Sequence, residues 1–169
     1  STVTASATFT TEGDGSIAGG LIASLQPTGV VTDSYTSDVT VSASRGAGGF
    51  VGSSSTVSPN QSTISRCYAL RPHVTATNVP GVIALMAGGF IGEMYYDNTV
   101  TPWIGGNISD SFVIGGSVTA YASTDTSYGG VAGFAASQNA MGSGSVIERS
   151  YVYGTAIQGE AVVVGGFVG

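Results

Sequence analysis

The chain has 169 residues, and only 8% of them are charged, against about 25% in an ordinary soluble domain. No run of 18 or more apolar residues exists, which excludes a transmembrane helix and predicts no membrane insertion. There is no lysine, and four arginines against ten acidic residues give a net charge of −6. Nucleic acids and anionic lipids both require clustered positive charge, so neither is an expected partner.

Composition favours an all-β protein. Apolar residues make up 42% of the chain and recur in ordered blocks, which argues against disorder. Val and Thr suit pleated strands, and 27 glycines supply turns. Cys67 is the single cysteine, so neither an intramolecular disulfide nor a cysteine-based metal site is expected, and no cofactor is predicted.

Three short blocks follow one another along the chain and recur in the same order. A Val-Thr block opens the chain, and its members are Val3-Thr4-Ala5, Val39-Thr40-Val41, Val74-Thr75-Ala76 and Val118-Thr119-Ala120, with a degenerate copy near Ala156-Ile157. A Gly-Gly block comes next, with members starting at Gly19, Gly48, Gly88, Gly129 and Gly165. An aliphatic-x-x-small-aromatic block follows, with members at 31–35, 64–68, 108–112 and 147–151.

This repeat predicts a parallel β-helix, or β-solenoid. Successive Gly-Gly pairs are 29, 40, 41 and 36 residues apart, and a period of 20–50 residues with β-like blocks is typical of solenoids and propellers. Three blocks per period favour a solenoid, because a propeller blade needs four strands. We therefore expect one domain, residues 1–169, with about four coils of three short strands each and repeats that start near 19, 48, 88, 129 and 165.

The third residue of each aliphatic-x-x-small-aromatic block predicts a structural ladder. It is occupied in turn by Asp33, Arg66, Asp110 and Arg149. Equivalent positions of neighbouring coils stack about 4.8 Å apart, so opposite charges alternate along the stack and attract one another. In the next position Cys67 replaces the serines of the other coils, which predicts a buried small side chain. His73, the only histidine, is expected on the surface.

The combination of Gly-Gly-Phe-Val-Gly, Ile-x-x-Ser-Tyr and Val-Thr resembles the GLUG-type repeat of bacterial surface adhesins. The residues that carry the resemblance are 48–52 with 64–68, 88–92 with 108–112, and 129–133 with 147–151. The first coil departs from the pattern, with Ala23 in place of the third glycine, and the connections are longer. The resemblance implies an extracellular, cell-surface protein and supplies no catalytic residues.

The sequence predicts no enzyme. A phosphate-binding loop needs a lysine, and no Gly-x-Ser-x-Gly elbow accompanies His73. We expect an extracellular structural or adhesive repeat protein. The alternatives are a glycan-binding or polysaccharide-acting β-helix protein and an ice-binding solenoid, the last suggested by a rank of Thr4, Thr40, Thr75 and Thr119.

The connection at 93–107 is the longest between the Gly-Gly block and the block that follows. It contains Tyr95, Tyr96, Asp97, Asn98 and Trp103, the only tryptophan. Aromatic rings beside Asp and Asn suit binding to glycans or to cell-surface proteins, and equally suit covering an exposed core edge. Candidate glycosylation sites are Asn60 and Asn107, each in an Asn-x-Ser sequence.

The two ends of the chain are out of phase with the repeat. The chain opens on a Val-Thr block and closes on a Gly-Gly block, without a polar capping segment. Solenoids normally need such caps. Two interpretations follow: copies of the chain stack end to end as a filament, or the chain is part of a longer array and stacks on neighbouring repeats.

Overall fold

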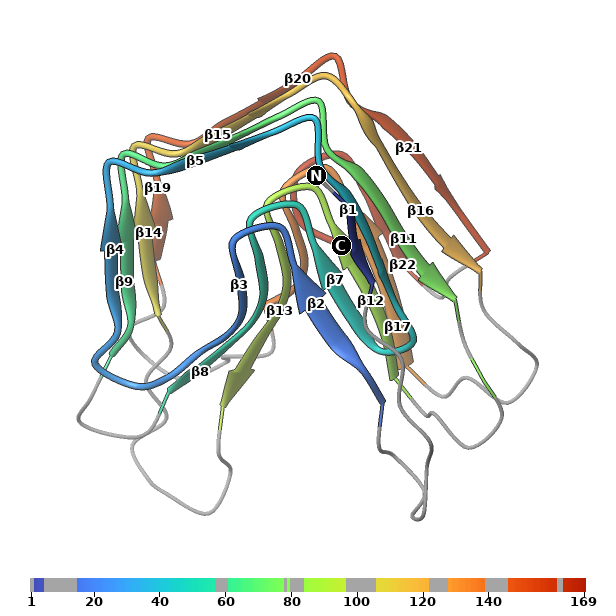
Figure 1. The fold of residues 1–169 in the computed structure, drawn as a ribbon, viewed down its shortest axis with the longest axis horizontal. Coiled ribbons are helices and arrows are strands. Elements are labelled where there is room, and N and C mark those ends of the chain that lie inside the picture. Colours follow the sequence, from blue (N-terminus) through green and yellow to red (C-terminus); the bar gives the residue numbers. More distant parts are fainter. Residues whose placement is uncertain are drawn as a thin grey trace.

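The computed structural model describes residues 2–4, 15–56, 61–77, 79, 84–96, 106–121, 128–138, 146–160 and 163–169. These residues form 22 short strands and contain no helix. Every strand pairs in parallel with equivalent strands elsewhere in the chain, so the fold is all-β and is a parallel β-solenoid (Figure 1). The expected fold class is confirmed at this level.

Five sheets, named A to E here, run along the solenoid. Sheet A contains β1 (Thr2–Thr4), β6 (Thr40–Ala43), β11 (His73–Thr77), β16 (Ser117–Tyr121) and β21 (Ala156–Gly159). Sheet B contains β2 (Ile17–Gly19), β7 (Gly46–Gly48), β12 (Ala84–Gly88), β17 (Tyr128–Ala132) and β22 (Val163–Gly165). Sheet C contains β3 (Ile22–Leu25), β8 (Val51–Thr56), β13 (Ile91–Tyr96) and β18 (Ala135–Gln138).

The remaining two sheets have four strands each. Sheet D contains β4 (Val30–Thr32), β9 (Thr63–Ser65), β14 (Asn107–Ser109) and β19 (Val146–Glu148). Sheet E contains β5 (Tyr35–Ser37), β10 (Tyr68–Leu70), β15 (Phe112–Ile114) and β20 (Tyr151–Tyr153). The chain visits the sheets in the order A, B, C, D, E and then begins again.

The expectation of three strands per coil is wrong, because consecutive members of one sheet are five strands apart in the chain. Two of the three sequence blocks each contain a corner and therefore two strands. The Gly-Gly block turns the chain from sheet B to sheet C, and the aliphatic-to-aromatic block turns it from sheet D to sheet E. The Val-Thr block supplies the single strand of sheet A.

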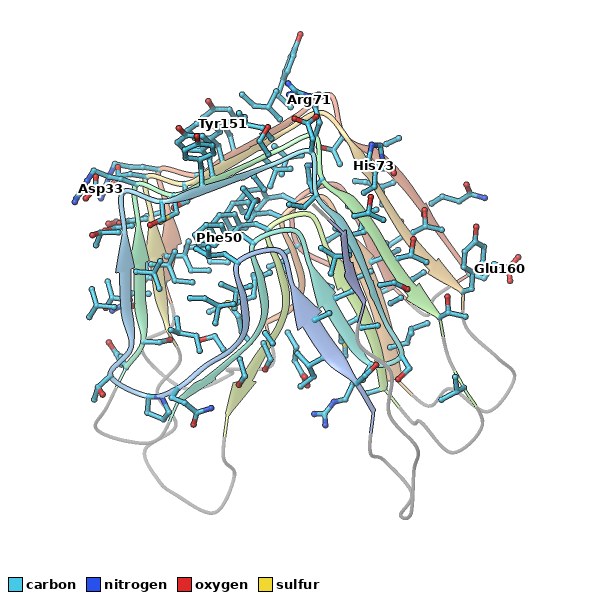
Figure 2. The ribbon with its side chains drawn as sticks, in the orientation of Figure 1. Asp33, Phe50, Arg71, His73, Tyr151 and Glu160 are labelled. Carbon is cyan, nitrogen blue, oxygen red and sulfur yellow. The ribbon has the colours of Figure 1, made fainter. Side chains whose placement is uncertain are left out.

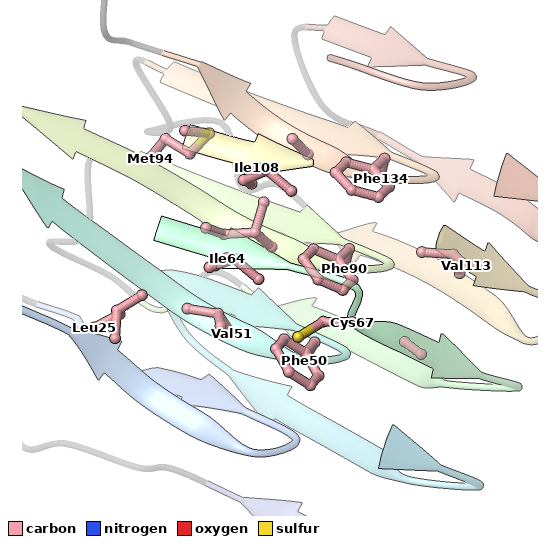
Figure 3. Packing of buried hydrophobic residues seen from close by; sticks show 13 residues of the cluster. Leu25, Phe50, Val51, Ile64, Cys67, Phe90, Met94, Ile108, Val113 and Phe134 are labelled. Carbon is pink, nitrogen blue, oxygen red and sulfur yellow. The ribbon is translucent and has the colours of Figure 1, made fainter. Parts of the chain in front are cut away.

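Sheets D, E and A form outer walls, and sheets B and C form an arch inside them (Figure 1). One hydrophobic cluster lies among sheets C, D and E and includes Phe50, Ile64 and Val113 (Figure 3). A second cluster lies between sheets A and B and consists mainly of smaller residues such as Val41 and Ala87. The inner arch thus divides the interior into two cores, one rich in large side chains and one rich in valine and alanine.

The second glycine of the Gly-Gly pair lies where the arch turns. A Cβ atom at Gly49 would collide with the carbonyl oxygen of Gly89, and a Cβ at Gly89 would collide with that of Gly133. Successive turns therefore stack backbone against backbone at this position, and only glycine leaves room.

This stacking corrects the register of the fourth Gly-Gly block. Gly88 pairs with Ala132, and Ile91 pairs with Ala135, so the equivalent segment starts at Ala132 and not at Gly129. Gly129 lies opposite Leu85 instead. The physical reason is that Gly133 has to stack on Gly89 and Phe134 on Phe90. A Gly-Gly pair in the sequence does not by itself show which glycine meets this requirement.

The rank of threonines on sheet A is also corrected. Thr4 and Thr75 both pair with Ser42, Thr75 pairs with Thr119, and Thr119 pairs with Gln158. Thr40 belongs to a different rank, because it pairs with Thr2 and His73. Val41, which is fully buried, pairs with Val74, the position that the sequence pattern gave to Val39. Val39 is also buried, just before β6. The regular threonine rank that suggested ice binding is therefore interrupted.

Candidate functional site: the face of sheet E and its two corners

The corner between sheets D and E holds the four residues of the expected ladder. Asp33, Arg66, Asp110 and Arg149 each follow a sheet D strand, and all four have left-handed backbones with φ between 46° and 53°. Asp tolerates this conformation better than most residues, whereas Arg adopts it rarely. In both cases here the arginine lies directly beside an aspartate of the preceding turn.

Each of these arginines binds an aspartate with two hydrogen bonds. Arg66 donates through Nε and Nη2 to the two carboxylate oxygens of Asp33, both at 2.6 Å. Arg149 donates in the same way to Asp110, at 2.6 and 2.9 Å, and also contacts Glu148. Between the two pairs, the positive charge of Arg66 also lowers the pKa of Asp110, without a hydrogen bond between the two side chains. The ladder is therefore two bidentate pairs in succession.

The paired arginines change the pKa of the aspartates. The hydrogen bond from Arg66 holds the pKa of Asp33 below its ordinary value, and the bond from Arg149 does the same for Asp110. All four side chains are exposed, so these pairs fix the alignment of the turns more than they add stability.

Sequence reasoning missed a second ladder at the corner between sheets E and A. Asp38 and Arg71 also have left-handed backbones and form a bidentate pair, with both bonds at 2.7 Å. Gly115 and Gly154 occupy the same corner in the next two turns, again with positive φ. The signal was present in the sequence, since these residues come five positions after Asp33, Arg66, Asp110 and Arg149. Figure 2 shows Asp33 and Arg71 at the two corners.

An aromatic column runs along the outer face of sheet E between the corners. Its members are Tyr35, Tyr68, Phe112 and Tyr151, with ring centroids 5.1, 4.8 and 5.1 Å apart and nearly parallel planes. Tyr151 points outward in Figure 2. The two middle rings of this column, Tyr68 and Phe112, have both faces covered by their neighbours, so they present only their edges to the outside. Sugars bind aromatic residues through the ring face, and this column offers a free face only at its two ends.

The residues that follow the corner between sheets D and E carry a hydroxyl or a thiol in every turn. They are Ser34, Cys67, Ser111 and Ser150. Ser111 donates its hydroxyl to the carbonyl of Ser109 and accepts the backbone N–H of Cys67. Cys67 is fully buried and directs its thiol at the carbonyl of Ser65, 3.2 Å away. Burial raises the pKa of this thiol, which keeps it protonated and unreactive. Its expected role as a buried small side chain is confirmed.

A third type of ion pair lies inside the arch. Arg45 donates from Nη2 to Oε1 of Glu93, at 3.2 Å, and the Glu93 side chain is 5% exposed. The other carboxylate oxygen of Glu93 is buried without a hydrogen bond. The sequence pattern placed residue 93 at the start of the connection at 93–107. In the structure Glu93 is part of β13, and its side chain is buried.

The other candidate residues divide into described and undescribed ones. His73 is exposed, as expected, and its Nδ1 lies 2.9 Å from the hydroxyl of Ser117. Asn107 lies in β14, half-buried, and its amide nitrogen donates to Gln61 at 2.8 Å, so the atom that a glycan would bond is engaged. The binding loop falls outside the described residues at Asp97, Asn98 and Trp103, and only the backbones of Tyr95 and Tyr96 are described. Asn60 is also outside them.

Within the described ranges, no three His, Cys, Asp or Glu side chains gather closely enough to hold a metal ion. The same residues include no helix of the length and hydropathy needed to cross a membrane. A small hollow beside Asn107, Ser109, Val146 and Glu148 opens on the outer face of sheet D. Its lining offers one carboxylate and no second titratable group, which is too little for acid–base chemistry.

No protein-family model matches the chain, and comparisons with curated proteins and with solved structures find no match either. The resemblance to GLUG-type repeats therefore stays a prediction.

Proposed function

We propose that this chain is a structural or adhesive element of an extracellular or cell-surface repeat protein, built from about four coils. The observation that carries the proposal is the use of its positive charge. All four arginines form ion pairs, and each pair joins one turn of the solenoid to the next: Arg45 with Glu93, Arg66 with Asp33, Arg71 with Asp38 and Arg149 with Asp110. None is left to bind a substrate.

Two aromatic columns support the same role. One lies outside sheet E, and the other is a phenylalanine column buried between the arch and the outer walls. Both run along the solenoid axis with every internal ring face occupied by a neighbouring turn. Side chains committed to stacking and pairing between turns favour a rod that neighbouring repeats or further copies extend. The proposal gives the chain no catalytic role and no cofactor.

Adhesion, in this proposal, is assigned to the connection with Tyr95, Tyr96, Asp97, Asn98 and Trp103. Its described start, β13, leaves the arch on the side of the molecule away from sheet E (Figure 1). A binding surface there would be separate from the exposed face of sheet E. Glycans and cell-surface proteins are the candidate ligands, and glycan binding or action on polysaccharides is the alternative function.

A glycan array and a cell-binding assay test the adhesive function. We expect the chain to bind, and a variant with Tyr95→Ala, Tyr96→Ala and Trp103→Ala to lose binding while its circular dichroism and melting curve stay unchanged. The matched control is Tyr153→Ala, which removes a ring that is 72% exposed on sheet E, outside that connection. Equal binding by the control and loss by the triple variant support the proposal. Absence of binding by the unaltered chain would leave only the structural role.

A further inference from the structure

The outer face of sheet E is mostly apolar. Beside the aromatic column, its outward side chains form a second column of Ser37, Leu70, Ile114 and Tyr153. The middle strands β10 and β15 each have a strand of sheet E on both sides, yet Leu70 and Ile114 are half-exposed, as are Tyr68 and Phe112. Their exposure therefore belongs to the face itself, and a contiguous apolar surface of this kind marks an interaction site.

The size and flatness of this face indicate a weak contact with another sheet. Four strands about 4.8 Å apart, each about six residues from corner to corner, give a face of roughly 19 by 20 Å, or about 400 Å². One partner of a stable interface of standard size buries about twice that area. Aligned packing of one sheet on another is the usual way to cover a flat apolar sheet.

The charges at the two corners of sheet E decide how a second copy can pack on this face. Two different two-fold axes lay the face on itself. If the axis is parallel to the solenoid axis, equal turns meet and the two corners exchange places. Arg66 then faces Arg71 of the second copy. Asp33 likewise faces Asp38, so both contacts bring like charges together, which disfavours this arrangement.

The other two-fold axis is perpendicular to the solenoid axis and lies in the plane of contact. The turns then meet in reverse order at the same corner, and the alternating ladder of Asp and Arg is complementary to itself. Arg66 faces Asp110 of the second copy, and this contact occurs twice about the axis. Arg66 pairs with Asp33 of its own chain through Nε and Nη2, so Nη1 remains to donate to the second carboxylate.

The apolar columns agree with the perpendicular axis. The middle strands β10 and β15 face each other across it, so Leu70 lies opposite Ile114 and the rings of the aromatic column also meet. In the outer turns the small Ser37 lies opposite Tyr153, the most exposed ring of the face. At the corner between sheets E and A, each charged residue faces a glycine of the second copy, which adds no repulsion.

We propose that the outer face of sheet E binds the same face of a second copy of this chain, about a two-fold axis perpendicular to the solenoid, with Arg66 of each copy beside Asp110 of the other. Residues stacked above or below these turns would lengthen the face without covering it. This inference rests on the proposed structural function, to which it adds the sideways pairing of rods.

Sedimentation equilibrium of the intact chain, from about 10 µM to about 1 mM, measures the association. Because the face is small, we expect a weak monomer–dimer equilibrium with a dissociation constant of tens to hundreds of micromolar. A chain that stays monomeric at the highest concentration would overturn the inference.

Two charge variants and their mixture test the arrangement. Arg66→Asp brings two pairs of acidic side chains together in its own dimer, and Asp110→Arg brings two pairs of basic ones together, so each should dimerise at least about tenfold more weakly. In an equal mixture each altered residue faces the opposite charge on the other variant. The mixture should therefore associate to within about threefold of the unaltered chain. Mixing cannot repair a ladder within one chain, so recovery reports the contact between copies.

The apolar centre of the contact is tested by Leu70→Thr. Threonine suits a strand but removes most of the apolar surface that Ile114 of the second copy would cover, so dimerisation should weaken about tenfold. The matched control is Tyr121→Thr, which removes an exposed ring from sheet A and should leave dimerisation unchanged. Circular dichroism and melting curves show whether each variant folds.

Three results would contradict the proposed arrangement. They are charge variants that mixing does not restore, equal effects of Leu70→Thr and its control, and tighter association of Arg66→Asp alone. The last result would indicate the axis parallel to the solenoid, where the new carboxylate faces Arg71. Absence of dimers alongside adhesion in the cell-binding assay would remove only this inference, because β13 carries the adhesive connection away from sheet E.

Discussion

Two aromatic columns run along the solenoid, one buried between the arch and the outer walls and one outside sheet E. The inner column consists of Phe50, Phe90, Phe134 and Phe167, with ring centroids 4.7 to 4.8 Å apart. The outer column, from Tyr35 to Tyr151, has almost the same spacing, 4.8 to 5.1 Å. The first three inner rings are fully buried, whereas Tyr35 is 58% exposed. The spacing therefore comes from the stacked turns, and burial alone distinguishes the two columns.

The largest effect is expected where the turns stack backbone on backbone beside the inner column. Gly89→Ala places a Cβ against the carbonyl oxygen of Gly133, and relief requires the turns to separate. We expect a loss of more than about 3 kcal/mol in the free energy of unfolding, measured by denaturant titration. The control is Gly166→Ala, at the same rank in the last turn, where a Cβ meets no atom within 4 Å. Equal effects of the two substitutions would contradict the stacking.

The two columns can be compared directly by removing one ring from each. Phe90→Ala deletes a fully buried ring and should cost about 3–5 kcal/mol of unfolding free energy. Phe112→Ala deletes a half-buried ring with two stacked neighbours and should cost about 1–2 kcal/mol. Calorimetry or denaturant titration of both variants measures the difference. A larger loss from Phe112→Ala would refute the view that burial, and not stacking, separates the columns.

Reversal of one corner charge should have a smaller effect. Arg66→Asp places three acidic side chains in succession on neighbouring turns and removes the bidentate pair with Asp33. We expect a lower melting temperature at low salt and a smaller difference at high salt, because these groups are exposed and screened. Arg66→Gly removes the charge without adding repulsion and is the control. A melting temperature that does not change at low salt would count against the ladder.

The smallest effect is expected from acid. The arginines hold the pKa values of Asp33, Asp38 and Asp110 below their ordinary value. Each carboxylate therefore contributes stability above its unfolded pKa of about 3.9, and this contribution is lost as the pH falls through the lower folded pKa. Stability should fall more steeply below pH 4 in the unaltered chain than in a triple Asp→Asn variant at these positions. Identical acid profiles would contradict the assignment.

The outer column and its corner were predictable from sequence because the block that carries them has no internal insertion. The aromatic residue always comes four positions after the aliphatic one, so Asp33, Arg66, Asp110 and Arg149 align without ambiguity. The presence of five strands in each turn was not predicted. The corner at Asp33 is made by a non-glycine residue with a left-handed backbone, so no glycine or proline in the sequence separates the two strands that flank it.

The inner column was only partly predictable. The sequence pattern suggested that the repeat containing Phe134 starts at Gly129-Gly130. In the structure the residue opposite Gly88 is Ala132, so this repeat starts three residues later. Packing of Phe134 on Phe90 decides this register, and contact between distant residues is not visible in a local pattern. The partly buried pair of Arg45 and Glu93 was missed for the same reason, since 48 residues separate its members.

One cross-linking measurement tests the register of the turns most directly. Ser34 lies beside Cys67 of the next turn, where the carbonyl of Ser34 accepts the N–H of Tyr68. Oxidation of a Ser34→Cys variant at a pH high enough to ionise the buried thiol of Cys67 should therefore form an intramolecular disulfide between the two residues, because stacked turns place their Cα atoms within about 5–6 Å. The intact mass should then fall by about 2 Da. The control is Ser37→Cys, in the same region but aligned with Leu70, which should stay unlinked. A folded Ser34→Cys variant that remains reduced, or a Ser37→Cys variant that links as readily, would contradict the stacked solenoid.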